Sequence, residues 1–163
     1  FLFGEPLYSN ISYDDPERNL ELIWDAAESA SLRGSIDDFP MKMHTIVGER
    51  GVTLSGGQKQ RATLARGLIR NAPVLILDDC FSSVDTKTEE HILSRLKRLR
   101  AGKTTILVSH RISTLRHSDR IVVLEAGEIV EIGSHEALLE LNGAYAQLER
   151  AQTLSDESLA VQG

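Results

Sequence analysis

The sequence predicts an α/β fold with a mostly parallel sheet. Two short apolar segments, Val74-Leu75-Ile76-Leu77 and residues 104–109, have the composition of strands that are buried on both faces of such a sheet. Between them lies a segment whose apolar residues recur at helical spacing. An alternation of strand, helix and strand, with further helical patterns on either side, is typical of α/β architecture.

The N-terminal part is predicted to be mainly helical. Asp15-Pro16 supplies an N-cap and a first-turn proline for a helix over residues 16–31. A stretch with glycine and proline but no periodicity then extends to about residue 54, which predicts a loop. A second helix begins near Ser55 and is ended by Pro73, because proline cannot donate the next helical hydrogen bond.

A third helix is predicted between the two strands. Thr86 and Glu89 have the spacing of a capping box at its start. Basic residues gather at its C-terminal end, where the helix dipole favours positive charge, and Gly102 can end the helix. The basic residues, Arg95, Lys97, Arg98 and Arg100, are interpreted as a solvated helix end rather than a nucleic-acid patch.

The C-terminal part is predicted to hold a β-hairpin and a last pair of short helices. Residues 121–124 and 129–132 read as two strands joined through Ala126-Gly127. Ser134 is expected to cap the helices, which end near residue 151. We therefore expect three parts: a helical part over residues 1–72, a sheet-containing part over residues 73–151, and a disordered polar tail over residues 152–163.

Composition excludes several classes of protein. The net charge is −6, from 18 Lys plus Arg and 24 Asp plus Glu, so the overall balance does not favour a nucleic-acid partner. A membrane helix needs about 20 apolar residues, and no such run is present, so any link to a membrane must go through a partner. One cysteine, Cys80, and the lack of a secretory signal indicate a reducing, cytosolic compartment. Because the chain opens on Phe1 rather than Met, we expect it to be a piece of a longer protein.

The strongest chemical signal is Leu54-Ser55-Gly56-Gly57-Gln58, which lies at the start of the second predicted helix. Two adjacent glycines let backbone N–H groups approach a ligand, and a helix N-terminus presents positive potential to an anion. A hydroxyl and an amide side chain flank the glycines as further hydrogen-bonding groups. Taken alone, the motif fits an ordinary N-cap turn equally well.

A second signal is the pair Asp78-Asp79 at the end of the first predicted strand. Ligands bind at the carboxyl edge of a parallel sheet, where a first carboxylate can hold Mg²⁺ and a second can orient an attacking water. Taken alone, a strand end followed by polar turn residues explains the pair as well.

These motifs, followed by Ser82-Ser83-Val84-Asp85 and by His110 after the second strand, resemble the ATP-binding-cassette (ABC) ATPase family. The resemblance extends to about residue 151. It implies a P-loop NTPase fold, of which this chain would hold the helical signature subdomain and the C-terminal half of the mostly parallel RecA-like core.

The resemblance also implies a role for each motif. Leu54 to Gln58, continuing through Lys59-Gln60-Arg61, would be the signature that contacts ATP bound by a partner cassette. Asp78 would end the Walker B strand and act on Mg²⁺, and His110 would contact the γ-phosphate. The remaining assignments are Ser83 and Asp85 as the dimer-facing D-loop, and the loop 45–51, with Gly48, Glu49 and Arg50, as the contact with transmembrane domains.

Two departures from the family pattern affect function. The phosphate-binding Walker A pattern G-x-x-x-x-G-K-[ST] is missing, since the triplet Gly102-Lys103-Thr104 follows a helix and lacks the first glycine. The residue after Asp78 is Asp79, where hydrolysing members have glutamate. Aspartate withdraws the carboxylate by roughly 1 Å, and a misplacement of that size can cost about 10²-fold in rate.

The resemblance therefore implies one subunit of a heterodimeric exporter of the multidrug or lipid-flippase type, at the cytoplasmic face of a membrane. Its partners would be a second cassette and transmembrane domains, and its cofactors ATP and Mg²⁺. The chain alone is expected to be inactive. The alternative is a non-enzymatic module that self-associates through an uncovered sheet or acts in trans.

The other reactive side chains are given structural interpretations. Cys80 is expected to be buried beside anionic groups, with a raised pKa and no redox role. His44, His91, His117 and His135 lack the spacing of metal ligands and are expected at the surface.

Overall fold

The computed structural model describes residues 2–48 and 51–160, with side chains to residue 154. The chain divides into two compact units, Phe1–Val108 and Ser109–Gly163, which are described separately. The first unit includes the parallel strands as well as the N-terminal helices. Within the described residues, every helix is too short or too polar to cross a bilayer.

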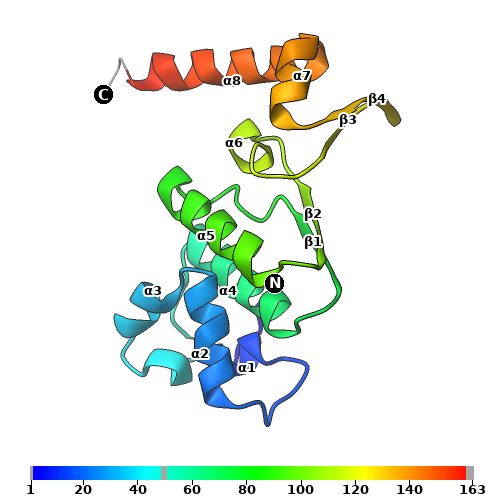
Figure 1. Cartoon of the computed structure of the whole chain (residues 1–163). Helices are drawn as coiled ribbons and strands as arrows, with labels where there is room; N and C mark the ends of the chain where they lie inside the picture. Colours follow the sequence, from blue (N-terminus) through cyan, green and yellow to red (C-terminus); the bar gives the residue numbers. More distant parts are fainter. Residues whose placement is uncertain (1, 49–50, 161–163) are drawn as a thin grey trace. The chain divides into compact units, whose positions relative to one another are not determined.

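The first unit begins with a layer of helices (Figure 1). The longest of these N-terminal helices, α4, packs against α1 and α2. Their bounds are α1 Leu7–Ile11, α2 Leu20–Ser29, α3 Arg33–Asp37, a 3-10 turn η1 Lys42–His44, and α4 Gly56–Ile69.

Helix α2 begins four residues later than predicted. Its N-cap is Asn19, whose side-chain oxygen accepts a hydrogen bond from Glu21 N, whereas Asp15 and Pro16 lie in the preceding turn. Asparagine is among the best N-cap residues, which explains the shift. The predicted loop before α4 holds α3 and η1, which are too short to produce a visible periodicity.

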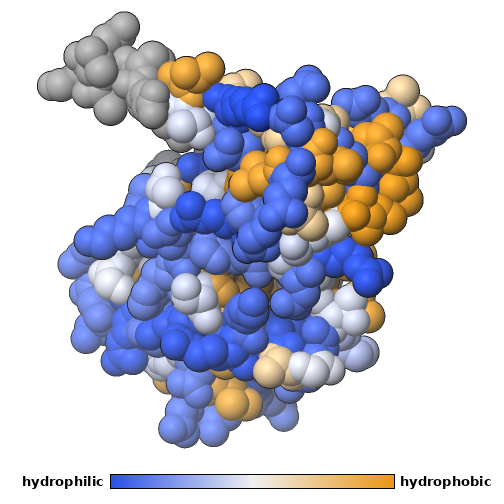
Figure 2. Space-filling view, turned by 45° about the horizontal axis from the view of Figure 1, so that its top comes forward, coloured by the Kyte–Doolittle hydropathy of each residue, from blue (hydrophilic) through white to orange (hydrophobic). Residues whose placement is uncertain are grey.

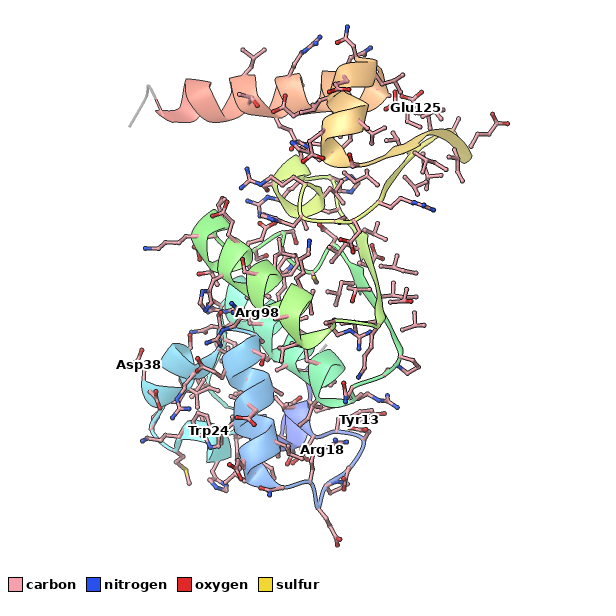
Figure 3. All side chains as sticks on the ribbon, viewed as in Figure 1. Tyr13, Arg18, Trp24, Asp38, Arg98 and Glu125 are labelled. Carbon is pink, nitrogen blue, oxygen red and sulfur yellow. The ribbon has the colours of Figure 1, made fainter. Side chains whose placement is uncertain are left out.

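A buried polar cluster anchors the N-terminal segment to α4. Asn10 is 1% exposed, and its amide bonds the backbone of Phe3, Glu5 and Pro6. Arg66 of α4 donates to the backbone oxygen of Asn10 at 2.6 Å, and its guanidinium lies 5.5 Å from the Phe3 ring centroid. The same guanidinium lies against the ring of Tyr13, labelled in Figure 3. Burial lowers the pKa of Arg66, and the interaction with Tyr13 opposes that effect.

Two parallel strands follow α4, as predicted. Strand β1 (Val74–Asp78) pairs with β2 (Thr104–Val108) in the register Ile76 to Ile106. Leu75 and Leu77 join the core of the first unit. The side chains on the opposite face are exposed to about half of their surface: Val74 51%, Ile76 63%, Ile106 46% and Val108 49%. The prediction that these strands are buried on both faces is therefore wrong.

Helix α5 (Thr86–Leu99) connects the two strands. Its N-cap is Asp85, whose side chain accepts from Thr88 N at 2.9 Å, so the predicted capping box of Thr86 and Glu89 is wrong. Aspartate is a better N-cap than threonine, and Glu89 is instead buried, with 1% of its surface exposed. The amphipathic stripe predicted for this helix is confirmed by the buried residues Ile92, Leu93 and Leu96.

The basic end of α5 is only partly solvated, which corrects the sequence interpretation. Arg100 is 7% exposed and donates to the backbone oxygens of Ala72, Pro73 and Thr104, where β1 and β2 begin. Arg95 reaches α2 and forms an ion pair with Glu28 at 2.9 Å. These two arginines therefore tie α5 to the sheet and to the helical layer.

The second unit contains α6 (Ile112–Leu115), β3 (Ile121–Glu125), β4 (Glu128–Gly133), α7 (His135–Leu141) and α8 (Ala144–Ala160). The predicted hairpin is confirmed: β3 and β4 are antiparallel, and Ala126 and Gly127 form the turn with φ of 50° and 85°. Ser134 caps α7, as predicted. Helix α8 continues to Ala160, which corrects the prediction of a disordered tail from residue 152.

We predict that Asn10→Ala lowers the free energy of unfolding of this chain by about 2–3 kcal/mol, since it leaves several buried backbone groups without the amide that bonds them. Urea-induced unfolding measures the effect. Asn19→Ala, which removes only an N-cap, is the control and should cost about 1 kcal/mol. Equal losses for the two variants would contradict the role of Asn10.

Candidate functional site

The predicted glycine motif forms the first turn of α4. Ser55 is the N-cap: its hydroxyl accepts from Gln58 N at 3.2 Å, and Gln58 Oε1 accepts from Ser55 N at 2.9 Å. This reciprocal pair is a capping box, so the two polar side chains that flank the glycines are engaged with the helix end itself. Leu54 is buried with 3% exposed and fixes the approach to the turn. The N–H groups of Gly56 and Gly57 remain without an intrahelical acceptor.

Both glycines lie against the segment that follows β1. A Cβ added to Gly56 would lie 3.1 Å from the side chain of Ser83, and one added to Gly57 would lie 2.7 Å from the Ser83 backbone oxygen. The second distance is shorter than any ordinary contact of a Cβ. The glycines are therefore needed for this close approach, independently of any ligand.

Gln60 joins the same two segments, and sequence reasoning did not single it out. Its Nε2 donates to Ser82 Oγ at 2.7 Å, and its Oε1 accepts from Ser83 N at 2.8 Å. These partners are 22 and 23 residues away along the chain. No local pattern in the sequence could have indicated the contact.

Asp78 and Asp79 are exposed at the carboxyl end of β1, where the sequence placed them. Asp79 has a left-handed backbone, with φ of 44°, and its N–H donates to Val108 O of β2 at 2.9 Å. Ser82 Oγ donates to the backbone oxygen of Asp79 at 3.3 Å. The strand thus turns sharply at Asp79 and leaves both carboxylates at the sheet edge.

Asp85 ends this segment as the N-cap of α5. Hydrogen bonds from the backbone and side chain of Thr88 hold the pKa of Asp85 below its ordinary value, and the positive charge of Arg61 adds a smaller effect. Burial lowers the pKa of Arg61, and Asp85 opposes that effect. Arg61 lies on α4, so a charge interaction accompanies the contacts of Gly57 and Gln60.

The other predicted site residues lie elsewhere. Gly48 has φ of 102° and approaches the backbone of Gly4, while Glu49 and Arg50 lie outside the described residues. His110 is exposed near the start of the second unit, where its backbone oxygen accepts from Gln152 Nε2. That His110 contacts the γ-phosphate at the site with Asp79 stays a prediction.

The interpretation of Gly102-Lys103-Thr104 as unrelated to phosphate binding stays a prediction. The triplet joins α5 to β2, and Lys103 Nζ donates to the backbone oxygen of Asn71 at 3.2 Å. This lysine therefore fastens the end of α4 to the start of β2.

Cys80 is partly buried rather than fully buried. Burial raises the pKa of its thiol to about 12, and the negative charges of Glu89, Asp79 and Asp78 contribute further. The prediction of a raised pKa is confirmed.

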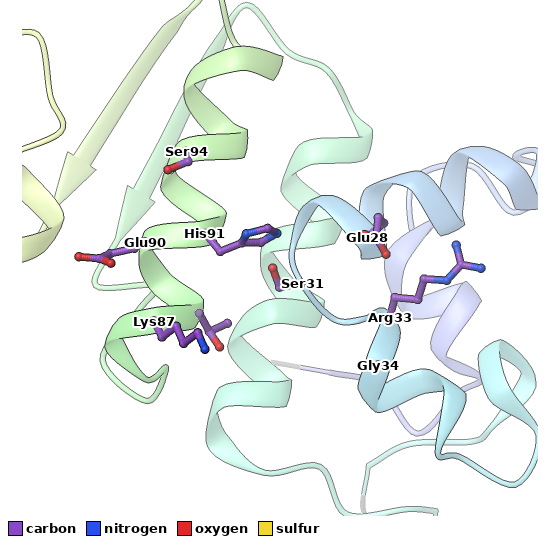
Figure 4. Close-up of a pocket in the computed structure, with 9 residues that line it drawn as sticks. Glu28, Ser31, Arg33, Gly34, Lys87, Glu90, His91 and Ser94 are labelled. Atoms are coloured by element: carbon purple, nitrogen blue, oxygen red, sulfur yellow. The ribbon is translucent and has the colours of Figure 1, made fainter.

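A pocket of about 590 Å³ lies between the end of α2, the start of α3 and the first turns of α5 (Figure 4). None of the predicted site residues lines it. Its lining mixes acidic and basic side chains, among them Glu28, Lys87, Glu90 and His91.

Comparisons with known proteins show similarity to ABC transporters and exporters. The family model described as ABC transporter matches residues 8–82. The chain is 45% identical over 152 residues to an ATP-dependent lipid A-core flippase of Alkalilimnicola ehrlichii, covering 93% of this chain and 26% of the relative. It is 44% identical to the putative multidrug export ATP-binding/permease protein YgaD of Bacillus subtilis, covering 95% of this chain and 27% of the relative.

A solved structure shows the same fold. It is described as a bacterial Atm1-family ABC exporter with ATP bound, and it matches with a TM-score of 0.87 and 40% sequence identity. The match covers 93% of this chain and 27% of that chain. The chain thus spans about a quarter of the length of these relatives.

We predict that Gly57→Ala destabilises the chain by about 1–3 kcal/mol, because the added methyl would overlap the Ser83 backbone oxygen. Gly34→Ala is the matched control, since no atom lies within 4 Å of its added Cβ. The control should be neutral or stabilise by up to about 1 kcal/mol. Urea-induced unfolding of both variants measures the difference, and equal effects would refute the close approach.

We also predict that native Cys80 resists alkylation. With a pKa of about 12, roughly one thiol in ten thousand is ionised at pH 8, against roughly one in ten at the ordinary value of 9.0. The rate of iodoacetamide labelling should therefore be far slower in the native chain than in urea, and it should still rise with pH above 10. Equal rates in the two states at pH 8 would contradict this.

Proposed function

We propose that this chain is part of the ATP-binding domain of an ABC exporter, coupling Mg-ATP binding and hydrolysis to transport. In this proposal ATP lies between two cassettes, bound by the Walker motifs of one and the signature of the other. Its binding closes the cassette dimer at the cytoplasmic face of the membrane. The loop with Gly48, Glu49 and Arg50 then transmits closure to transmembrane domains.

The observation that supports the proposal most strongly is the contact between the predicted signature and the predicted D-loop. The first turn of α4 and the segment with Ser82 and Ser83 form one contact surface, joined by Gln60 and by the approach of Gly57. On that surface the N–H groups of Gly56 and Gly57 can receive an anion, with the helix dipole behind them.

The residues present fit Mg²⁺ and ATP chemistry in part. Asp78 and Asp79 are exposed carboxylates at the carboxyl end of a parallel strand, and carboxylate oxygens suit Mg²⁺. Bound Mg²⁺ would neutralise charge that develops on the phosphates. In the proposal Asp78 holds the metal through water, Asp79 polarises the attacking water weakly, and His110 contacts the γ-phosphate.

The aspartate at position 79 leads us to propose a heterodimer. Its shorter side chain would leave the site completed by Asp78 with little hydrolytic activity. The intact signature would serve the other, competent site, where a partner cassette supplies Walker A and the catalytic glutamate. By the same proposal this chain alone is inactive, since its sequence contains no pattern for a phosphate-binding loop.

A second candidate function, self-association, is favoured by a different observation. The outer face of β1 and β2 exposes four apolar side chains in adjacent register, as described above. The hairpin of the second unit also exposes apolar residues. Figure 2 shows apolar side chains, in orange, that gather in a patch at the surface. An uncovered apolar sheet face favours association with a second copy of the chain.

We predict that Asp79→Glu raises the ATPase turnover of the exporter that contains this chain by about 10- to 100-fold at the site that Asp78 completes. Phosphate release by purified transporter whose competent site is silenced, by replacing the partner's catalytic glutamate, measures it. In parallel, Gly57→Asp should abolish turnover, because the added side chain overlaps the Ser83 backbone oxygen and brings a negative charge to the helix start that would receive the phosphate.

Unchanged turnover in Asp79→Glu would show that side-chain length is not what limits hydrolysis. Unchanged turnover in Gly57→Asp would refute the role of the signature in ATP binding, and with it the proposed function.

We further predict that Ile76→Lys suppresses self-association of the chain. Ile76 is 63% exposed, so the charge disrupts the apolar face without entering the core. Light scattering over a concentration series measures the mass. Leu141→Lys, at a residue of α7 that is 62% exposed and lies outside both sheets, is the matched control and should leave association unchanged. A wild-type chain that stays monomeric at high concentration would exclude this candidate.

A further inference from the structure

Gln60 is placed to fix the geometry between the signature and the D-loop. Its side chain is partly buried, and both its amide nitrogen and its amide oxygen form hydrogen bonds with the segment after β1. The donor end bonds the Ser82 hydroxyl, and the acceptor end bonds the Ser83 N–H. A backbone N–H in a loop would ordinarily bond water or a nearby carbonyl, whereas here it bonds a side chain of a different element.

The contact continues from Ser82 to Asp79. The Ser82 hydroxyl that accepts from Gln60 donates in turn to the backbone oxygen of Asp79. Asp79 has a left-handed backbone, which costs free energy for a residue other than glycine and persists only where neighbours hold it. A chain of hydrogen bonds thus runs from α4 to the residue that follows the metal-binding aspartate.

Only a side chain with a donor and an acceptor can make both bonds. Alanine loses both. Glutamate keeps the acceptor for the Ser83 N–H, and the Ser82 hydroxyl can rotate to donate to the carboxylate, but it then loses its hydrogen bond to the Asp79 backbone oxygen. Alanine therefore removes the contacts to Ser82 and Ser83, whereas glutamate keeps them and removes only the link to Asp79.

We propose that Gln60 is a positioning residue, which holds Ser82 and Ser83 against the first turn of α4 and, through Ser82, supports the backbone of Asp79. The signature and the D-loop then move as one body. Its consequence for ATP turnover rests on the proposed function, whereas the contact itself does not.

Hydrogen exchange of the Ser83 amide in this chain tests the contact. In Gln60→Ala we expect the Ser83 amide to exchange at least about tenfold faster, with the amides in the middle of α4 unchanged. Gln60→Glu should stay within about twofold of wild type, and Ser82→Ala, at an exposed residue, should lie between the two. Gln147→Ala, an exposed glutamine of α8, is the control for a general effect. Unchanged Ser83 exchange in Gln60→Ala would overturn the proposal.

Should Gln60→Ala fail to fold, Ser82→Ala and Gln60→Glu still decide the question. Ser82→Ala removes one bond and leaves the side chain of Gln60 in place. An increase in Ser83 exchange in that variant, together with near wild-type exchange in Gln60→Glu, supports the proposal. Unchanged exchange in Ser82→Ala overturns it.

Steady-state kinetics of the exporter that contains this chain test the consequence. We expect Gln60→Ala to lower kcat about tenfold with KM changed less than twofold, because it misplaces the D-loop rather than weakening ATP binding. Gln60→Glu, which keeps the contact with Ser83 and loses the link to Asp79, should have a kcat between those of wild type and Gln60→Ala. Fast Ser83 exchange with unchanged kcat would overturn the positioning role.

The two proposals fail in different ways. If the proposed ABC function is wrong, turnover stays unchanged in Gly57→Asp. The exchange rate of the Ser83 amide in the Gln60 variants does not depend on that outcome. Failure of the positioning role would appear in the Gln60 variants while Gly57→Asp still abolishes turnover.

Discussion

The close approach of α4 to the chain that follows β1 is the constraint on which the site depends. The backbone oxygen of Ser83 lies where a Cβ of Gly57 would be, so this approach requires a glycine at that position. Gln60 adds two hydrogen bonds, and Arg61 and Asp85 add a charge interaction between the same elements. Because several different interactions converge there, the first turn of α4 and the strand end that carries the carboxylates are positioned by one packing contact.

The rest of the first unit holds the two ends of that contact in place. Arg66, clamped by Asn10 and two aromatic rings, fixes α4 to the N-terminal segment. Arg100 bonds the start of both strands, and Arg95 ties α5 to α2. Arginine suits these positions because its planar guanidinium donates to several acceptors at once. These three arginines thus connect elements inside the first unit. The helical periodicity of the sequence does not predict these contacts.

Sequence reasoning was most successful where the signal is local. The strands β1 and β2, the hairpin with its Ala126-Gly127 turn, and the Ser134 cap all come from patterns of a few neighbouring residues. It failed where two local signals compete or where an element is short. Asp85 displaced Thr86 as the cap of α5, and the helices α1, α3 and α6 have too few residues to establish a period.

The motifs, and with them the resemblance to ABC ATPases, were accessible from the sequence, because each motif consists of adjacent residues whose chemistry can be read without coordinates. The glycine pair, the carboxylate pair and the missing phosphate-binding pattern belong to that class. The fold was needed to show that Gln60 reaches Ser82 and Ser83, that Arg100 is buried, and that Ile76 faces outward. The physical reason is distance along the chain: contacts between residues more than 20 positions apart leave no periodic or local signature and arise only when the elements pack.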